Sequence, residues 1–199
     1  KSDLDWRTSG GPLVFNSIYT SEHYDARLEQ PGWSSPGFDD SAWGGVMYRG
    51  APSQRVTAQQ TVPIRNVTEY RPRSVRKLDE RSYLYDFGQN MAGVTKLRLR
   101  GEAGTQLRLI HAERLREDGH ADLSNIDVYF RPTDKDDLFQ TDVVTLSGRD
   151  DEFMPRFNYK GFRYVEVVAD RPVELSAENL TAYAMHSDVT PVGHIETSN

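Results

Sequence analysis

Hydrophobic and polar residues alternate with a period of two through much of the chain. Lys96 and Arg98, for example, alternate with Leu97 and Leu99. Successive side chains of a β-strand point to opposite faces, so this pattern indicates half-buried strands. It predicts strands near residues 83–87, 93–100, 105–114, 138–146, 151–157, 162–168 and 176–186. No segment of helical length carries a 3.6-residue apolar stripe, so the pattern favours an all-β protein.

Turn residues indicate how some of these strands are joined. Gly101 and Gly104 separate the strands near 93–100 and 105–114, and this spacing favours a β-hairpin. Strands with one apolar face each are expected to pack as an antiparallel β-sandwich, with two sheets around a shared core. We expect that core to bury Trp43, Leu97, Leu99, Leu107, Leu109, Phe157 and Phe162.

One strand combines aromatic and β-branched residues and follows a turn that contains Pro, Asn and Gly. Strict alternation puts Phe162, Tyr164 and Val168 on one face and Val165 and Val167 on the other. Because both faces carry apolar side chains, we expect both to be buried in part.

The first third of the chain is predicted to be rich in loops, because glycines and prolines interrupt its short apolar segments. Phe38 and Trp43 flank a turn that they can anchor to a core. Residues 56–72 form either an extended connection or further strands of the same sandwich, and we favour the second. The sequence therefore predicts one β-sandwich domain at residues 1–188, with a possible internal boundary near 66–72.

Composition narrows the classes of protein and partner. The chain has 199 residues, a hydrophobic share of 37% and a mean hydropathy of -0.68, which is typical of a soluble globular protein. No apolar run approaches the roughly 18 residues of a membrane span, so we expect no membrane partner. The net charge is -6 and the basic residues are scattered, so we expect no nucleic-acid partner. The absence of cysteine leaves the compartment open, cytoplasmic or secreted.

An N-terminal segment concentrates amide, hydroxyl, carboxylate and guanidinium groups beside aromatic residues. Planar polar side chains can bind the hydroxyls of a sugar, and an aromatic face can pack against its C–H surface. We therefore single out Asn16, Glu22, Asp25 and Trp33 as candidate carbohydrate-binding residues. A purely structural alternative remains open, in which Asp25 pairs with Arg27 and Trp33 belongs to the core.

Carboxylates elsewhere raise the question of glycosidase chemistry, which uses two acidic groups roughly 5 to 9.5 Å apart. Glu113 is the best single candidate, since it follows Leu107 and Leu109 on one strand face. We favour the alternative, a strand-end glutamate that is solvated or paired with Arg114 or Arg116, and predict no catalytic residue in this chain.

Other charged groups carry no recognisable metal pattern. The acidic stretches 134–137 and 150–152 lack the ligand spacing of a calcium loop, so we expect solvated loops. The histidines His111, His120, His186 and His194 show no two-on-one-face metal spacing. In the segment that begins at Tyr85, we expect Asp86 and Asn90 to bond loop amides.

Three motifs occur in an order that resembles a known family. They read YDFGQNMAG at 85–93, PRFNYKGFRYVEV at 155–167 and GHIETSN at 193–199. Together they resemble the β-sandwich region that precedes the catalytic barrel in bacterial α-L-rhamnosidases. The resemblance implies a sandwich of the jelly-roll, galactose-binding-like or concanavalin-like type. It also implies that residues 189–199 lead toward a helical (α/α)6 catalytic domain, which is the expected partner and carries the acids of an inverting mechanism.

A second resemblance concerns the residues Glu22, Tyr24, Asp25, Ala26 and Arg27. They are similar to a jelly-roll segment that, in some family members, binds rhamnose through a bridging calcium ion. Ser21 replaces the usual glycine, and Ser17 stands where calcium-binding members place an acidic and amide pair. A hydroxyl is a poorer calcium ligand than a carboxylate, so we expect no cofactor and little effect of calcium.

The function predicted from these observations is a non-catalytic part of an α-L-rhamnosidase-like hydrolase. This part would support the catalytic barrel and contact rhamnosides, and the alternative is a calcium-assisted rhamnose-binding module. One further departure is Lys160, where a histidine is common before the Gly-Phe-Arg-Tyr motif.

Overall fold

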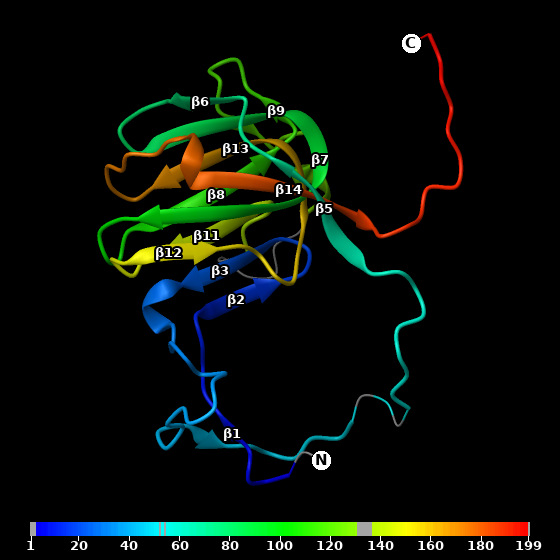
Figure 1. The fold of residues 1–199 in the computed structure, drawn as a ribbon. Coiled ribbons are helices and arrows are strands. Elements are labelled where there is room, and N and C mark those ends of the chain that lie inside the picture. Colours follow the sequence, from blue (N-terminus) through cyan, green and yellow to red (C-terminus); the bar gives the residue numbers. More distant parts are fainter. Residues whose placement is uncertain (1–2, 52, 54, 131–136, 199) are drawn as a thin grey trace.

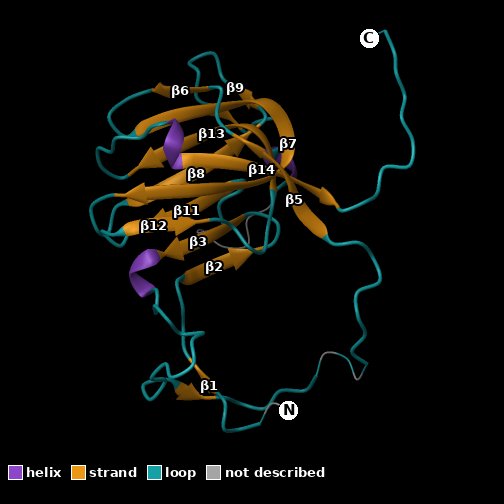
Figure 2. Ribbon diagram, viewed as in Figure 1, coloured by secondary structure: helices purple, strands orange, loops and turns teal. Residues whose placement is uncertain are grey.

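The computed structural model describes residues 3–51, 53, 55–130 and 137–198 and shows an all-β protein (Figures 1 and 2). Its main sheet has ten strands, in the order β2-β3-β11-β8-β13-β7-β14-β5, and β6 and β12 also pair with β7. Their bounds are β2 Leu13–Ser17, β3 Ser21–Asp25, β5 Ile64–Tyr70, β6 Ser74–Lys77, β7 Ser82–Arg100, β8 Gln106–Ala112, β11 Thr141–Thr145, β12 Asp150–Phe153, β13 Lys160–Ala169 and β14 Leu180–Ser187.

Two small sheets accompany the main one, and helix is confined to single turns. β1 (Arg7–Thr8) pairs with β4 (Gly44–Gly45), and β9 (Arg114–Leu115) pairs with β10 (Ala121–Asp122). The helical turns of the described residues are of the 3-10 type, η1 (Ala26–Leu28), η2 (Asp127–Tyr129) and η3 (Ala177–Asn179). Within those residues no helix is long and apolar enough to cross a membrane.

The main sheet curls around a single hydrophobic core. β7, with 19 residues, pairs with β6 and β13 along its first half and with β12 and β14 along its second half. The core takes side chains from both halves of β7, such as Tyr85 and Leu97, and from other strands, such as Leu109 of β8 and Leu180 of β14. This arrangement confirms the sandwich-like, all-β fold. One pair departs from the predicted antiparallel pattern, because β3 and β11 run parallel.

The predicted hairpin between residues 93–100 and 105–114 is wrong. β13 lies between β7 and β8 in the sheet and pairs with both. The turn after β7 instead bonds to Leu146, whose carbonyl accepts from Gly104 N at 2.8 Å and whose N donates to Thr105 O at 2.9 Å. Alternation along a strand reveals which side chains share a face, but it carries no information about the neighbouring strand.

The predicted faces of β13 are also wrong. The register against β7 shifts between Phe162 and Tyr164, which marks a β-bulge or similar irregularity. Such an irregularity inserts a residue and inverts the alternation beyond it. Phe162, Val165 and Val167 consequently all face the core, whereas Tyr164 lies only partly buried outside it. The guanidinium of Arg163, at the irregularity, makes two hydrogen bonds of 2.9 Å to the Asp86 carboxylate.

Most of the predicted core is confirmed, and two members are not. Leu97, Leu107, Leu109 and Phe162 are at most 1% exposed, and Leu99 packs half-buried against them. Phe157 is 56% exposed, because β12 ends at Phe153 and residue 157 lies in the following loop. Trp43 is only partly buried and packs on Phe38, with 5.6 Å between the ring centroids.

Before β5, the described part of the chain contributes only β2 and β3 to the main sheet. β1 comes before β2 in the chain, and β4, which follows β3, returns to pair with β1; Figure 1 shows this small sheet away from the main one. The described residues between β4 and β5 contain no strand, so residues 56–72 are a connection up to 63 and sandwich strand from 64 to 70. β5 pairs with β14, beyond which the chain extends away from the sheet.

Candidate functional site

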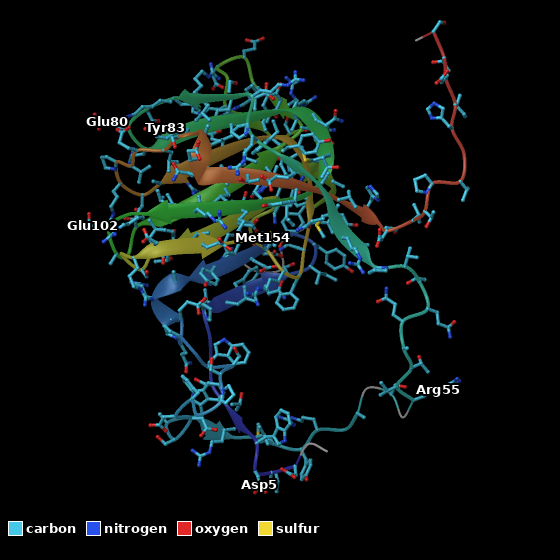
Figure 3. All side chains as sticks on the ribbon, in the orientation of Figure 1. Asp5, Arg55, Glu80, Tyr83, Glu102 and Met154 are labelled. Carbon is cyan, nitrogen blue, oxygen red and sulfur yellow. The ribbon has the colours of Figure 1, made fainter. Side chains whose placement is uncertain are left out.

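A cavity of about 420 Å³ lies where the N-terminal residues meet the sheet. Its lining comes from residues 7–13, from β3 and the loop after it, and from the loop between β12 and β13, which Met154 marks in Figure 3. The aromatic lining residues are Tyr24, Trp33, Trp43, Phe153 and Phe157, and the charged ones are Arg7, Glu22, Glu29, Glu152 and Arg156. Apolar rings and charged groups therefore share one concave surface.

Glu22 is the most buried charged residue of this lining. It is 2% exposed at the start of β3, and its Oε1 accepts from the backbone N of Arg156 at 2.8 Å and of Phe157 at 2.6 Å. Burial raises the pKa of the Glu22 carboxyl, and the two backbone donors act in the opposite direction. The carboxyl thus fixes the backbone of the loop that forms one wall of the cavity.

Hydrogen bonds also hold the aromatic walls. Trp43 Nε1 donates to Gln30 Oε1 at 2.8 Å, and the Gln30 amide in turn donates to Gly10 O at 2.9 Å. The Tyr24 hydroxyl donates to Glu29, and burial together with this bond raises the pKa of Tyr24. Aromatic rings whose polar tips are bonded in this way present a defined apolar face to the cavity.

The structure brings two of the four candidate residues together. Glu22 and Trp33 line the cavity, and Trp33 is 59% exposed, so it does not belong to the core. Asn16 lies exposed on β2, outside the lining. Asp25, also outside it, forms hydrogen bonds of 2.9 and 2.7 Å with the Arg27 guanidinium and caps η1, and these bonds hold its pKa below the ordinary value.

Several lining residues were not predicted as part of a site. Trp43 was expected to anchor a turn in the core, and Phe157 was expected in a strand. No sequence pattern pointed to Arg156, which lines the cavity from the loop between β12 and β13. Tyr24 could have been found, since it lies in the family-like segment between two of the candidates.

Glu113 does not show the surroundings of a catalytic acid. It is exposed, and its Oε1 accepts from Asn90 Nδ2 at 3.0 Å. Asn90 thus bonds a carboxylate and not the expected loop amide, whereas Asp86 does accept from the N of Gly88 at 2.7 Å. The expected partners of Glu113 bind elsewhere: Arg114 pairs with Asp122 and Arg116 with Asp118.

Metal ligands do not gather in the described part of the chain. There, no group of three or more His, Cys, Asp or Glu side chains could hold an ion. Of the predicted solvated loop 134–137, residues 134–136 lie outside the described residues, and Asp137 is buried and accepts from Thr20. His111 is fully buried, which lowers its pKa to about 4, and it bonds Thr95 at 2.9 Å.

The curled all-β sheet around one core defines a β-sandwich-like fold. Residues 76–186 match the family described as bacterial alpha-L-rhamnosidase concanavalin-like domain, and residues 1–68 match the alpha-L-rhamnosidase N-terminal domain. The chain therefore belongs to the bacterial α-L-rhamnosidase family.

Individual relatives agree with this assignment. The α-L-rhamnosidase of Streptomyces avermitilis is 39% identical over 99% of the chain, and one from Formosa agariphila is 32% identical over all of it. Among solved structures, the Dictyoglumus thermophilum α-L-rhamnosidase superposes with a TM-score of 0.86 at 36% identity over the whole chain. The Streptomyces avermitilis α-L-rhamnosidase complexed with L-rhamnose gives 0.80 at 39% identity over 94%.

The chain spans only part of each relative. It covers 18% and 20% of the two related sequences, and 22% and 17% of the two related structures. The match therefore concerns one region of much longer proteins.

Proposed function

We propose that this chain is a non-catalytic β-sandwich region of an α-L-rhamnosidase and that it supports the catalytic domain of that enzyme. One observation carries the proposal: the chain aligns over nearly all its length with α-L-rhamnosidases but covers about a fifth of them. The whole protein would cleave terminal α-L-rhamnosyl bonds by inversion, with one acid protonating the leaving oxygen and one carboxylate activating water.

Exposed apolar side chains support a role in packing against another domain. They occur in the connection before β5 and in the segment after β14: Met47, Tyr48, Val56, Val62, Val189, Val192 and Ile195. The connection around Arg55 extends away from the sheet in Figure 3. In the proposed support role, a neighbouring folded domain removes these side chains from water.

The proposal is tested by assaying the purified chain with an aryl α-L-rhamnoside. We expect no turnover. Glu113→Gln is the informative companion variant, because Glu113 is the strongest carboxylate candidate in the sequence. Turnover by the wild-type chain contradicts the proposal whether or not the variant loses it. The support role is tested by removing the corresponding region from a full-length relative, which should lower the melting temperature of the remainder.

The cavity favours a second function, the binding of a rhamnoside. Sugar sites combine an aromatic face with planar hydrogen-bonding groups, and Trp33 and Glu22 offer both on one surface. We propose weak binding of L-rhamnose there, through Trp33 and Glu22 and without Asn16 and Asp25. Calcium should have little effect, since Ser17 supplies no carboxylate.

Calorimetric or NMR titration of L-rhamnose, with calcium and then with chelator, tests this function. Trp33→Ala should weaken binding by about tenfold or more, which corresponds to the ~1.4 kcal/mol of one aromatic contact. Asn16→Ala is the matched control and should change affinity much less. Binding that disappears with chelator would restore the calcium-assisted alternative, and no binding in either condition would leave support as the sole function.

A further inference from the structure

Behind the cavity wall lies a charged pair that neither function above uses. Lys160 begins β13 and Asp142 lies on β11, and their side chains are 2% and 0% exposed. Lys160 Nζ donates to Asp142 Oδ1 and to Asn158 Oδ1, both at 2.7 Å. The ammonium therefore links β11 to the loop that precedes β13.

This pair connects directly to the cavity. Asp142 Oδ1 also accepts from the backbone N of Glu22 at 2.9 Å, and the Glu22 carboxyl accepts from the N of Arg156 and Phe157. The loop is thus held at two places, at residues 156 and 157 by Glu22 and at Asn158 by Lys160. Glu22, through its backbone N, and Lys160 both donate to the same oxygen of Asp142. Two residues of the loop, Arg156 and Phe157, line the cavity.

Stability alone is a poor explanation for this network. Two ions lose their hydration when they are buried, so a buried pair often stabilises a protein no more than apolar residues would. Moreover, Asp142 Oδ2 and Asn158 Nδ2 are buried and make no hydrogen bond to another described residue, so the network does not use all its polar atoms. The network does fix relative positions, because each of its bonds joins two of four segments: β3, β11, the loop before β13 and β13 itself.

We propose that Lys160 is a positioning residue, which sets the shape of the cavity through Asp142, Asn158 and the Glu22-bound loop. The position of the loop determines where Phe157 and Arg156 lie in the lining that they share with Trp33, and hence which ligand fits. The identity of the ligand rests on the proposed rhamnoside binding; the positioning itself does not.

Hydrogen exchange at single amides tests the positioning without any ligand. Lys160→Met removes the ammonium but leaves Asp142 charged and buried, so a second variant, Lys160→Met with Asp142→Asn, removes both charges and keeps an acceptor for Glu22 N. In each variant we expect the amides of Arg156 and Phe157 to exchange at least about tenfold faster, with the β8 amides unchanged. Lys77→Met is the matched control, because Lys77 makes an ion pair of the same 2.7 Å length on the surface.

Two outcomes overturn the proposal. One is unchanged exchange at Arg156 and Phe157 in both Lys160 variants. The other is acceleration shared equally by the β8 amides, which would show global destabilisation and no local role.

Titration of L-rhamnose separates this proposal from the function it builds on. Failure of the wild type to bind contradicts rhamnoside binding, while the exchange experiment still decides on Lys160. If the wild type binds, the double variant should bind about tenfold more weakly; equal affinity would overturn the role of Lys160 in shaping the site.

Discussion

The core of the main sheet and the N-terminal residues that lie outside this sheet use similar side chains with different results. In the sandwich, Phe87 and Phe162 pack edge to face inside a closed core, both at most 2% exposed. In the N-terminal region, Phe38 and Trp43 also pack together, yet Trp33, Met47 and Tyr48 stay mostly exposed. Aromatic residues alone do not make a core, because burial requires strands on both sides that exclude water. Where such strands are missing, the same rings remain available to a ligand or a neighbouring domain.

The largest expected contrast is between two phenylalanines. Phe162→Ala should lower the free energy of unfolding by about 3–5 kcal/mol, because it empties a site in the closed core. Phe157→Ala, at a ring that is 56% exposed, should change it by about 0.5 kcal/mol or less. Urea denaturation of both variants measures the difference, and equal losses would show that the loop after β12 is packed like the core.

Acid should act on the sandwich interior through His111. Burial lowers its folded-state pKa to about 4, below the 6.5 of the exposed group. Between these values the unfolded state binds the proton and the folded state does not, so stability is present above pH 6.5 and is lost as the pH falls toward 4. The loss should reach about 3 kcal/mol.

The titration of His111 is isolated by comparison with His111→Gln. Burial raises the pKa of Glu22, which acts in the opposite direction, so the difference between the two unfolding curves is the quantity to measure. Denaturation midpoints of wild type and variant that run parallel from pH 7 to pH 4 would be inconsistent with a neutral, buried His111.

Glycines separate the two regions at a smaller scale. A Cβ on Gly93 of β7 would lie 2.0 Å from the carbonyl oxygen of Tyr183 on β14, whereas one on Gly45 of β4 meets nothing within 4 Å. Gly93→Ala should therefore destabilise the protein by about 1–3 kcal/mol through overpacking. Gly45→Ala should shift stability by less than about 1 kcal/mol. Thermal unfolding of the two variants provides the test, and a tolerated Gly93→Ala would mean that β14 can move away from β7.

The smallest expected effect concerns the cap of η1. Asp25 accepts from the backbone N of Arg27 at 3.0 Å, so Asp25→Ala should cost about 0.5–1 kcal/mol. Asp25→Asn keeps the cap and removes the charge. If unfolding of the asparagine variant matches that of the alanine variant, the ion pair with Arg27 matters more than the cap.

The sequence by itself determined the local features of this protein. Alternation at Leu97, Leu107 and Leu109 predicted which side chains enter the core, and the motifs at 85–93 and 155–167 predicted the family. Both kinds of signal lie within one strand or turn, so they need no knowledge of the rest of the chain.

Only the tertiary structure decided which strands are neighbours and which side chains meet. β13 separates β7 from β8, an irregularity at Arg163 inverts the faces of a strand, and Glu22 meets Arg156 across 134 residues of sequence. Strand pairing joins residues far apart in the chain, and its register follows from the packing of the whole core. The cavity inherits this dependence, because Trp33, Glu22 and Phe157 become one surface only after β3, β11 and β13 have paired around that core.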